Sequence, residues 1–240
     1  MFINKLRQSV KPIMVLICNH PFNEQLANGT LSPKKLKRFL KQDSFYLIDY
    51  ADALERVAHE LPDPHHGNIF RKFANETIAS ERDIHKEYTL PLAQEKSAAC
   101  VEYTQYLLST AYAPNKPIAE KVASLVPCIL IYNVLGKQAS ENKTENNPYQ
   151  KWIDLYSNDE YSASADLAIE VLNDLGTTAS AETKIKMFAA FQRATQLELA
   201  FFDDAYYNQK VMWPQSETPD SPSNETQPTD PTLARTLQSK

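Results

Sequence analysis

The stretch from Val122 to Gly136 constrains the fold more than any other part of the chain. Its apolar residues recur at every third or fourth position, which is the spacing of one helix face. They are Val122, Leu125, Ile129, Tyr132 and Leu135. Pro117 suits a first helical turn, and Gly136 is expected to end the helix. We therefore predict a buried helix around which the rest of the chain is organised.

This predicted helix carries an unusual pair of neighbours, Pro127 and Cys128. A proline inside a helix removes one N–H and presses against the carbonyl four residues earlier, at a cost of about 3 kcal/mol. Cys128 and Tyr132 are four residues apart, so their side chains share one face. A lone buried cysteine is usually just a small hydrophobic residue. This kinked stretch alone therefore leaves both a packing role and a reactive site open.

Composition favours helices in the rest of the chain as well. With 4 Gly against 15 Pro in 240 residues, the chain lacks the many turns that a sheet requires. A hydrophobic content of 42% supports a sizeable core. From Pro214 onward, Pro, Ser, Thr and Gln dominate, and such a segment cannot offset its ordering entropy. We expect a helical domain over residues 1–213 and a disordered tail over residues 214–240.

Charge and cysteine usage narrow the expected partners and location. Because the net charge is −5, we expect neither nucleic acid nor an anionic membrane as a partner. Three cysteines without a Cys-x-x-Cys pair are typical of a reducing cytoplasm. The N-terminus resembles a secretory signal, but the apolar run over residues 12–18 is short and lacks a cleavage site, so we predict a helix there. No apolar run is expected to reach the roughly 20 residues of a membrane span.

Two long helices each place a carboxylate where their apolar stripe requires a hydrophobic residue. Asp43 interrupts the stripe of the helix expected over residues 32–61, on the same face as Tyr46. Glu198 interrupts the helix expected over residues 180–207. A buried carboxylate is unfavourable unless it is paired or hydrogen-bonded. For Asp43, an interhelical hydrogen bond and the recognition of a ligand both remain open.

The remaining segments are predicted to be helices too. They cover residues 2–17, 68–90, 97–111, 149–156 and 162–175. Asn68 is the expected cap of the second segment, and Gly176 the expected end of the last. Asp203 and Asp204 are expected to lie off the buried stripe.

Three helices far apart in sequence thus each carry one reactive group, namely Asp43, Cys128 and Glu198. In a helical bundle such faces converge on one interior, where sites are built. Together the three groups predict a pocket whose tyrosine walls suit a planar ring. Burial raises the pKa of Glu198 and favours a proton donor near neutral pH. A neighbouring base could activate Cys128 as a thiolate.

The order and spacing of these motifs resemble the TenA family, also called thiaminase II or aminopyrimidine aminohydrolase. The matching segments are HPF (20–22), QDSFYL (42–47), HKE (85–87), YT (103–104), LVPCILIY (125–132, continuing to Gly136), NPYQKWI (147–153, with Tyr156) and ELAFF (198–202, with Ala205 and Tyr206). The resemblance extends over residues 1–213, and the ordered set makes it specific.

The resemblance implies an all-α, haem-oxygenase-like helical bundle that needs no cofactor or metal and is usually a homotetramer. It implies hydrolysis of 4-amino-5-aminomethyl-2-methylpyrimidine to the hydroxymethylpyrimidine and ammonia in thiamine salvage, and cleavage of thiamine itself. By this resemblance, Cys128 matches the nucleophile that attacks the ring. Glu198 matches the acid/base that protonates the leaving group and activates water. Asp43 matches the carboxylate that hydrogen-bonds the pyrimidine. The implied pocket walls are Tyr46, Tyr103, Tyr132, Tyr156 and Phe201.

The chain departs from the family pattern around the predicted pocket. Residues 129–131 are Ile-Leu-Ile where aromatics are frequent, Phe202 replaces a common Trp, and Leu197 replaces a frequent aromatic. These differences bear on pocket shape and substrate preference more than on the chemistry. A branch of the family without the cysteine acts on formylated precursors, and Cys128 argues against that branch.

Two other functions remain open from the sequence. A haem- or di-iron-type oxidase on the same bundle would need carboxylates and histidines on several helices. All five histidines precede residue 86, although His20 could still be a single haem ligand. A protein that binds or senses a pyrimidine without turning it over would not need the thiol. The combination of Asp43, Cys128 and Glu198 therefore favours an enzyme.

Overall fold

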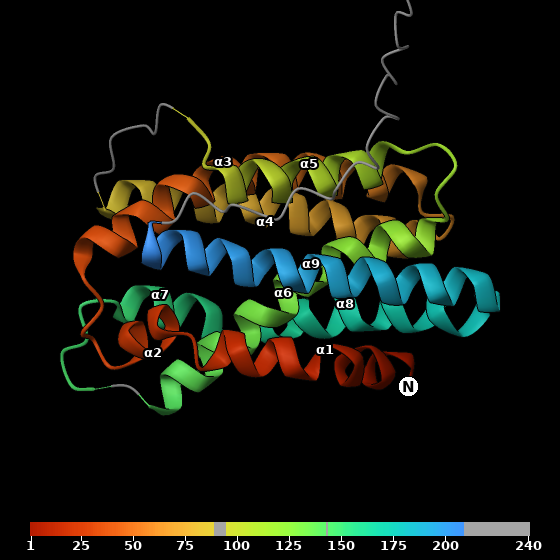
Figure 1. Ribbon diagram of the computed structural model, residues 1–240. Coiled ribbons are helices and arrows are strands. Elements are labelled where there is room, and N and C mark those ends of the chain that lie inside the picture. The colour runs from red at the N-terminus through yellow and green to blue at the C-terminus, as the bar shows by residue number, and fades with distance from the viewer. Residues whose placement is uncertain (89–94, 143, 209–240) are drawn as a thin grey trace, which may run out of the picture.

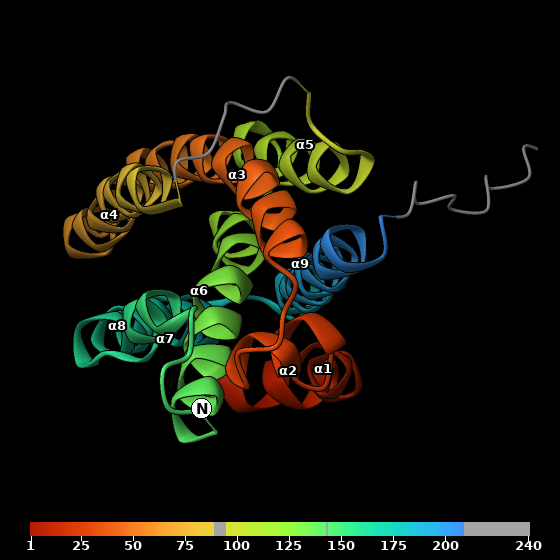
Figure 2. The same ribbon diagram turned by 90° about the vertical axis from the view of Figure 1, so that its left-hand side faces the viewer.

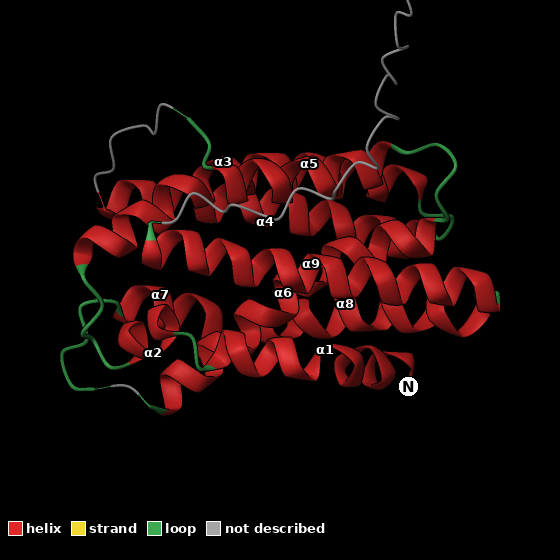
Figure 3. Ribbon diagram, viewed as in Figure 1, coloured by secondary structure: helices red, strands yellow, loops and turns green. Residues whose placement is uncertain are grey.

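The computed structural model describes residues 1–88, 95–142 and 144–208, and the predicted tail over residues 214–240 lies outside this part. Its helices are α1 (Phe2–Cys18), α2 (Pro21–Ala27), α3 (Pro33–Glu60), α4 (Pro64–Tyr88), α5 (Ala98–Tyr112), α6 (Ile118–Glu141), α7 (Gln150–Ser157), α8 (Asp159–Thr178) and α9 (Ala181–Tyr207). The described residues contain no strand (Figure 3). The prediction of an all-α bundle is therefore confirmed.

Helix α6 runs through the middle of the bundle (Figures 1 and 2). It packs mainly against α9, α7 and α8, with α2, α3 and α5 also in contact. Helices α3, α4 and α5 form one side of the molecule, and α1 packs against α9 on the other. Contrary to expectation, α6 is long and apolar enough to cross a membrane. Because 83% of its apolar window is buried inside the bundle, α6 is the central helix of the core.

Local capping chemistry sets several helix starts. Ser97 and Ser180 accept hydrogen bonds from backbone N–H groups in the first turns of α5 and α9. These two helix starts agree with the predicted ones. The predicted start of α4 at Asn68 is wrong, because α4 begins at Pro64. The Asp63 carboxylate accepts a hydrogen bond of 2.8 Å from a backbone N–H in the first turn, and proline fits that turn without losing a bond.

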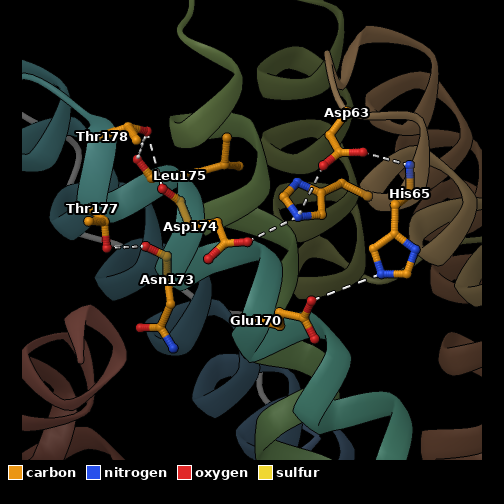
Figure 4. Close-up of polar contacts among 9 residues, drawn as sticks. Asp63, His65, Glu170, Asn173, Asp174, Leu175, Thr177 and Thr178 are labelled. Carbon is orange, nitrogen blue, oxygen red and sulfur yellow. Dashed lines mark hydrogen bonds and ion pairs between the residues drawn. The ribbon is translucent and has the colours of Figure 1, made fainter.

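Polar contacts join the first turn of α4 to the last turns of α8 (Figure 4). The buried His66 ring lies 3.2 Å from the Asp174 carboxylate, and His65 lies 3.9 Å from Glu170. These contacts hold the start of α4 against α8. Both helices also supply residues that line the cavity described below.

Two glycines that were predicted to end helices lie inside them instead. A Cβ on Gly136 would lie 2.7 Å from the Cβ of Tyr156 and closer still to its carbonyl group. A Cβ on Gly176 would lie 2.8 Å from Cε1 of the Phe2 ring and closer still to two other ring atoms. Both glycines therefore permit close packing between helices, inside α6 at Gly136 and in the last turn of α8 at Gly176.

The expectation for Asp204 is also wrong. Its side chain is buried near the end of α9, where the carboxylate pairs with Arg38 of α3 at 3.0 Å. Asp203 is only partly buried, with 44% of its side chain exposed, as expected for a residue off the stripe. The ion pair compensates for burial of the Asp204 charge and ties α9 to α3.

Candidate active site

A cavity of about 90 Å³ lies between α3, α4, α6, α7 and α8. Five of the eight predicted site residues line it, namely Asp43, Tyr46, Cys128, Tyr132 and Tyr156. The side chains of Cys128 and Tyr132 share the face of α6 that their spacing predicted. Pro127 lies within α6, as expected, just before the cavity-lining thiol.

The other three predicted site residues lie directly behind this cavity. The Tyr103 hydroxyl donates a hydrogen bond of 3.0 Å to Glu198 Oε1, which joins α5 to α9. Tyr46 packs against Tyr103 and Phe201, with ring centroids 4.8 and 5.8 Å apart. Tyr46 therefore connects the cavity to the buried carboxyl group of Glu198. The structure brings all eight predicted residues into one continuous cluster.

Burial controls the protonation of the two reactive groups. Glu198 is only 1% exposed, and this burial raises its pKa from the ordinary value of 4.5 to about 7. Hydrogen bonds from Tyr103 and Cys128 act in the opposite direction and keep the pKa from rising further. Near neutral pH, Glu198 can therefore both give and accept a proton.

Cys128 is a neutral thiol in the resting protein. Burial raises its pKa well above the ordinary value of 9.0, and the negative charge of Glu198 raises it further. Among the groups of the described residues that shift the pKa of this thiol most, none is a cation that would stabilise a thiolate. Glu198 is a hydrogen-bonding neighbour of the thiol.

Tyrosines form the walls of the cavity. Tyr46 and Tyr50 stack with their ring centroids 5.4 Å apart and 14° between the planes. Tyr132 and Tyr156 also line the cavity, and their ring centroids are 4.9 Å apart. The buried Tyr46 hydroxyl lies near enough to Cys128 to lower the pKa of the thiol, yet it makes no hydrogen bond of good geometry with any described residue. Such an unsatisfied hydroxyl is suited to bind a polar group of a ligand.

The cavity lining extends beyond the eight predicted site residues. The additional residues are Leu47, Tyr50, Phe73, Glu76, Thr77, Ile129, Tyr161 and Ser164. Tyr50 had a signal, because it lies four residues after Tyr46 on the same helix face. Glu76 had one as well, because it lies three residues after Phe73 and so places a carboxylate on the apolar face of its helix. Tyr161 and Ser164 had none, because only the fold brings α8 to the cavity.

Most departures from the family pattern lie away from the cavity. Ile129 lines it, whereas Leu130 and Ile131 face a separate groove between α1 and α6. Leu197 and Phe202 are buried but do not line the cavity. The replacement that bears most directly on the shape of the site is therefore Ile129.

His20, the candidate haem ligand, has a structural role in this fold. Its Nδ1 atom accepts a hydrogen bond of 3.1 Å from the backbone N–H of Phe22 and thereby caps α2. Its Nε2 atom lies 3.2 Å from the Asp203 carboxylate. Because both ring nitrogens have protein partners, neither is free to bind iron in this arrangement.

This fold and this cluster define a helical protein with a tyrosine-walled interior cavity, next to which lie the thiol of Cys128 and the carboxyl groups of Asp43, Glu76 and Glu198. The chain belongs to the TENA/THI-4/PQQC family, whose profile matches residues 7–209.

Two curated relatives and one solved structure illustrate the relationship. An aminopyrimidine aminohydrolase from Halalkalibacterium halodurans is 30% identical over 222 residues, which cover 88% of this chain and 97% of the relative. A protein of the same name from Bacillus subtilis is 26% identical over 195 residues, which cover 78% of this chain and 82% of that relative. A TenA homologue from Pyrococcus furiosus superposes with a TM-score of 0.80 at 22% identity, covering 86% of this chain and all of that one. This last similarity concerns the fold alone.

Proposed function

We propose that this protein is an aminopyrimidine aminohydrolase of the cysteine-containing TenA branch. It hydrolyses 4-amino-5-aminomethyl-2-methylpyrimidine to the hydroxymethylpyrimidine and ammonia, and it also cleaves thiamine. Relatives that carry this enzyme name and align with most of the chain support a hydrolase of thiamine metabolism. The single observation that carries the finer proposal is the buried cluster in which Cys128 and Asp43 line one cavity and Glu198 neighbours the thiol.

In the proposed mechanism, Asp43 hydrogen-bonds the aminopyrimidine while the tyrosine walls stack against its ring. Ionised Glu198 takes the thiol proton as the sulfur of Cys128 bonds to the ring, so the proton moves onto a group with a pKa near 7. With the aminomethyl substrate, Glu198 then gives this proton to the amine nitrogen as the bond between that nitrogen and the methylene carbon breaks, which releases ammonia. With thiamine, the thiazole leaves as a neutral base when the same bond breaks, and the proton of Glu198 passes to solvent. Glu198 next removes a proton from water, and the oxygen of this water bonds to the methylene carbon. Glu198 then returns a proton to the sulfur of Cys128 as the carbon–sulfur bond breaks.

The cavity has to widen before it can hold a substrate. Its volume of about 90 Å³ is well below the roughly 300 Å³ at which ligand pockets typically begin. Ser164 of α8 donates a hydrogen bond of 3.5 Å to Glu76 of α4, and both residues line the cavity, so a separation of these two helices would enlarge the site. Substrate binding should therefore be accompanied by movement at the seam between α4 and α8.

Parallel assays of the purified protein on the aminomethylpyrimidine and on thiamine test this function. Released ammonia reports the first reaction, and the hydroxymethylpyrimidine product is common to both. We expect turnover of both substrates, with Glu198→Gln inactive on each. Tight binding of the pyrimidine without any turnover would instead support the non-catalytic pyrimidine-binding protein that the sequence left open. The homotetramer and the cytoplasmic location stay predictions, to be checked by light scattering and by cell fractionation.

A further inference from the structure

Glu76 of α4 is a carboxylate in the cavity lining to which the proposed mechanism gives no role. Asp43 and Cys128, which carry the proposed chemistry, are only 4% and 6% exposed. By contrast, 39% of the Glu76 side chain is exposed. Glu76 therefore lies where the cavity lining reaches solvent, and its negative charge acts on the charge of any ligand that enters there.

Each oxygen of the Glu76 carboxylate has a partner. Oε1 lies 3.3 Å from Nζ of Lys72, one turn earlier on α4, and Oε2 accepts the hydrogen bond of 3.5 Å from Ser164 of α8. The Lys72 side chain is 51% exposed, so this ion pair is weak and readily exchanged. Because a carboxylate offers about four lone-pair positions, Glu76 keeps acceptor capacity for a ligand.

An aromatic ring lines the cavity from the helix that Glu76 contacts. Tyr161 of α8 precedes Ser164 by three residues, so the two side chains share one helix face. The Tyr161 ring stands nearly perpendicular to that of Tyr156, with the ring centroids 5.1 Å apart. A carboxylate and a tyrosine ring that line the same cavity together suit a planar cation, through charge and through the cation–π interaction.

The order of the proposed reaction directs the leaving group of thiamine toward this seam. The leaving group departs while the pyrimidine stays bonded to Cys128, so it has to occupy the side of the cavity that opens to solvent. The seam between α4 and α8 is also the place where the cavity of about 90 Å³ is expected to widen for a substrate. The ring that leaves thiamine is a thiazolium, which is planar and carries a permanent positive charge.

We propose that Glu76 binds the thiazolium ring of thiamine and thereby makes the enzyme selective for a cationic leaving group. This inference rests on the proposed function. When the bond between the methylene carbon and the ring nitrogen breaks, its electron pair stays with the nitrogen, so the cationic ring becomes a neutral thiazole. Glu76 thus attracts the ring of the substrate but not that of the product. Since the charge already decreases in the transition state, Glu76 lowers KM without raising kcat.

A binding experiment without turnover tests this role. Calorimetry on the full-length Cys128→Ser protein compares thiamine with the hydroxymethylpyrimidine, which is uncharged at pH 8. Adding Glu76→Gln removes the charge but keeps an oxygen that can accept the hydrogen bond from Ser164. We expect the dissociation constant of thiamine to rise about three- to fivefold, the upper range for a partly exposed charge pair, and that of the hydroxymethylpyrimidine to stay unchanged. Asp166→Asn, the matched control, changes an exposed carboxylate of α8 outside the cavity lining and should alter neither constant.

Steady-state kinetics of Glu76→Gln with Cys128 intact give a second readout. KM for thiamine should rise about three- to fivefold while kcat does not fall, and added salt should raise KM less than it does in the wild type. An unchanged affinity for thiamine, or an equal loss of affinity for the uncharged pyrimidine, would overturn the proposal. Failure of the proposed function would look different, because the wild type would not cleave thiamine although thiamine binding would still depend on Glu76.

Discussion

Replacing Glu198 by Gln should remove a pH dependence from the stability of the fold. In the folded protein Glu198 has a pKa of about 7, against an ordinary value of 4.5. The folded state therefore holds the proton to higher pH than the unfolded state, and unfolding releases it between these two values. Stability consequently falls as pH rises from 4.5 to about 7, and it levels off above that.

The size of the effect follows from the two pKa values. At about 1.4 kcal/mol per pKa unit, the rise corresponds to about 3 kcal/mol of lost stability at pH 8 compared with pH 4.5. A glutamine at position 198 has no charge to lose, and its carbonyl oxygen can still accept the hydrogen bond from Tyr103. The stability advantage of the variant should therefore grow from near zero at pH 4.5 to about 3 kcal/mol at pH 8.

Urea unfolding at a series of pH values measures this difference. The control is Glu160→Gln, which changes an exposed carboxylate at the start of α8 and should leave the pH profile of stability unaltered. The contradicting result is a constant difference between the free energies of unfolding of the wild type and Glu198→Gln from pH 4.5 to 8. It would show that Glu198 has an ordinary pKa. The proton transfers assigned to it would then lack their physical basis.

Three further outcomes follow from the structure. Asp43→Ala should weaken pyrimidine binding by about 1.5–3 kcal/mol, the range for a hydrogen bond to a charged group, and calorimetry would show normal binding if Asp43 only supports the fold. Tyr103→Phe removes a hydrogen bond that lowers the pKa of Glu198, so the acid limb of the pH–rate profile should move to higher pH, and an unmoved limb would contradict this role. Gly136→Ala should destabilise the fold by about 1–3 kcal/mol, because its Cβ overlaps with Tyr156, and an unchanged melting temperature would refute the close contact.

The helical periodicity of the sequence was sufficient to predict the bundle and to place its chemistry. Asp43, Cys128 and Glu198 could be singled out because each interrupts an apolar stripe, and burial of a carboxylate needs a reason. The stripes also predicted that these groups converge. Periodicity within one helix does not say which helices become neighbours, however, so the contributions of Tyr161 and Ser164 to the cavity could not be foreseen.

The errors have physical causes that local sequence does not reveal. A glycine after an apolar stripe resembles a helix end, yet Gly136 and Gly176 lie within α6 and α8 and are required by the side chains that pack against them. Asp204 was expected to lie off the buried stripe, but its side chain is buried and Arg38 from a distant helix compensates for that burial. In each case the deciding partner lies far away in sequence, and only the tertiary fold brings it close.

The central claim is that Cys128 is the nucleophile, and the turnover of Cys128→Ser tests it most directly. A hydroxyl is close in size to a thiol but is a far weaker nucleophile without a dedicated base, so we expect a normal fold and a loss of nearly all hydrolysis of both substrates. Cys18→Ser and Cys100→Ser are matched controls, since neither residue lines the cavity. Their turnover should stay near that of the wild type. If Cys128→Ser folds normally and keeps more than about a tenth of wild-type turnover, a change of only about 1.4 kcal/mol in the barrier, the assignment of Cys128 as nucleophile is wrong.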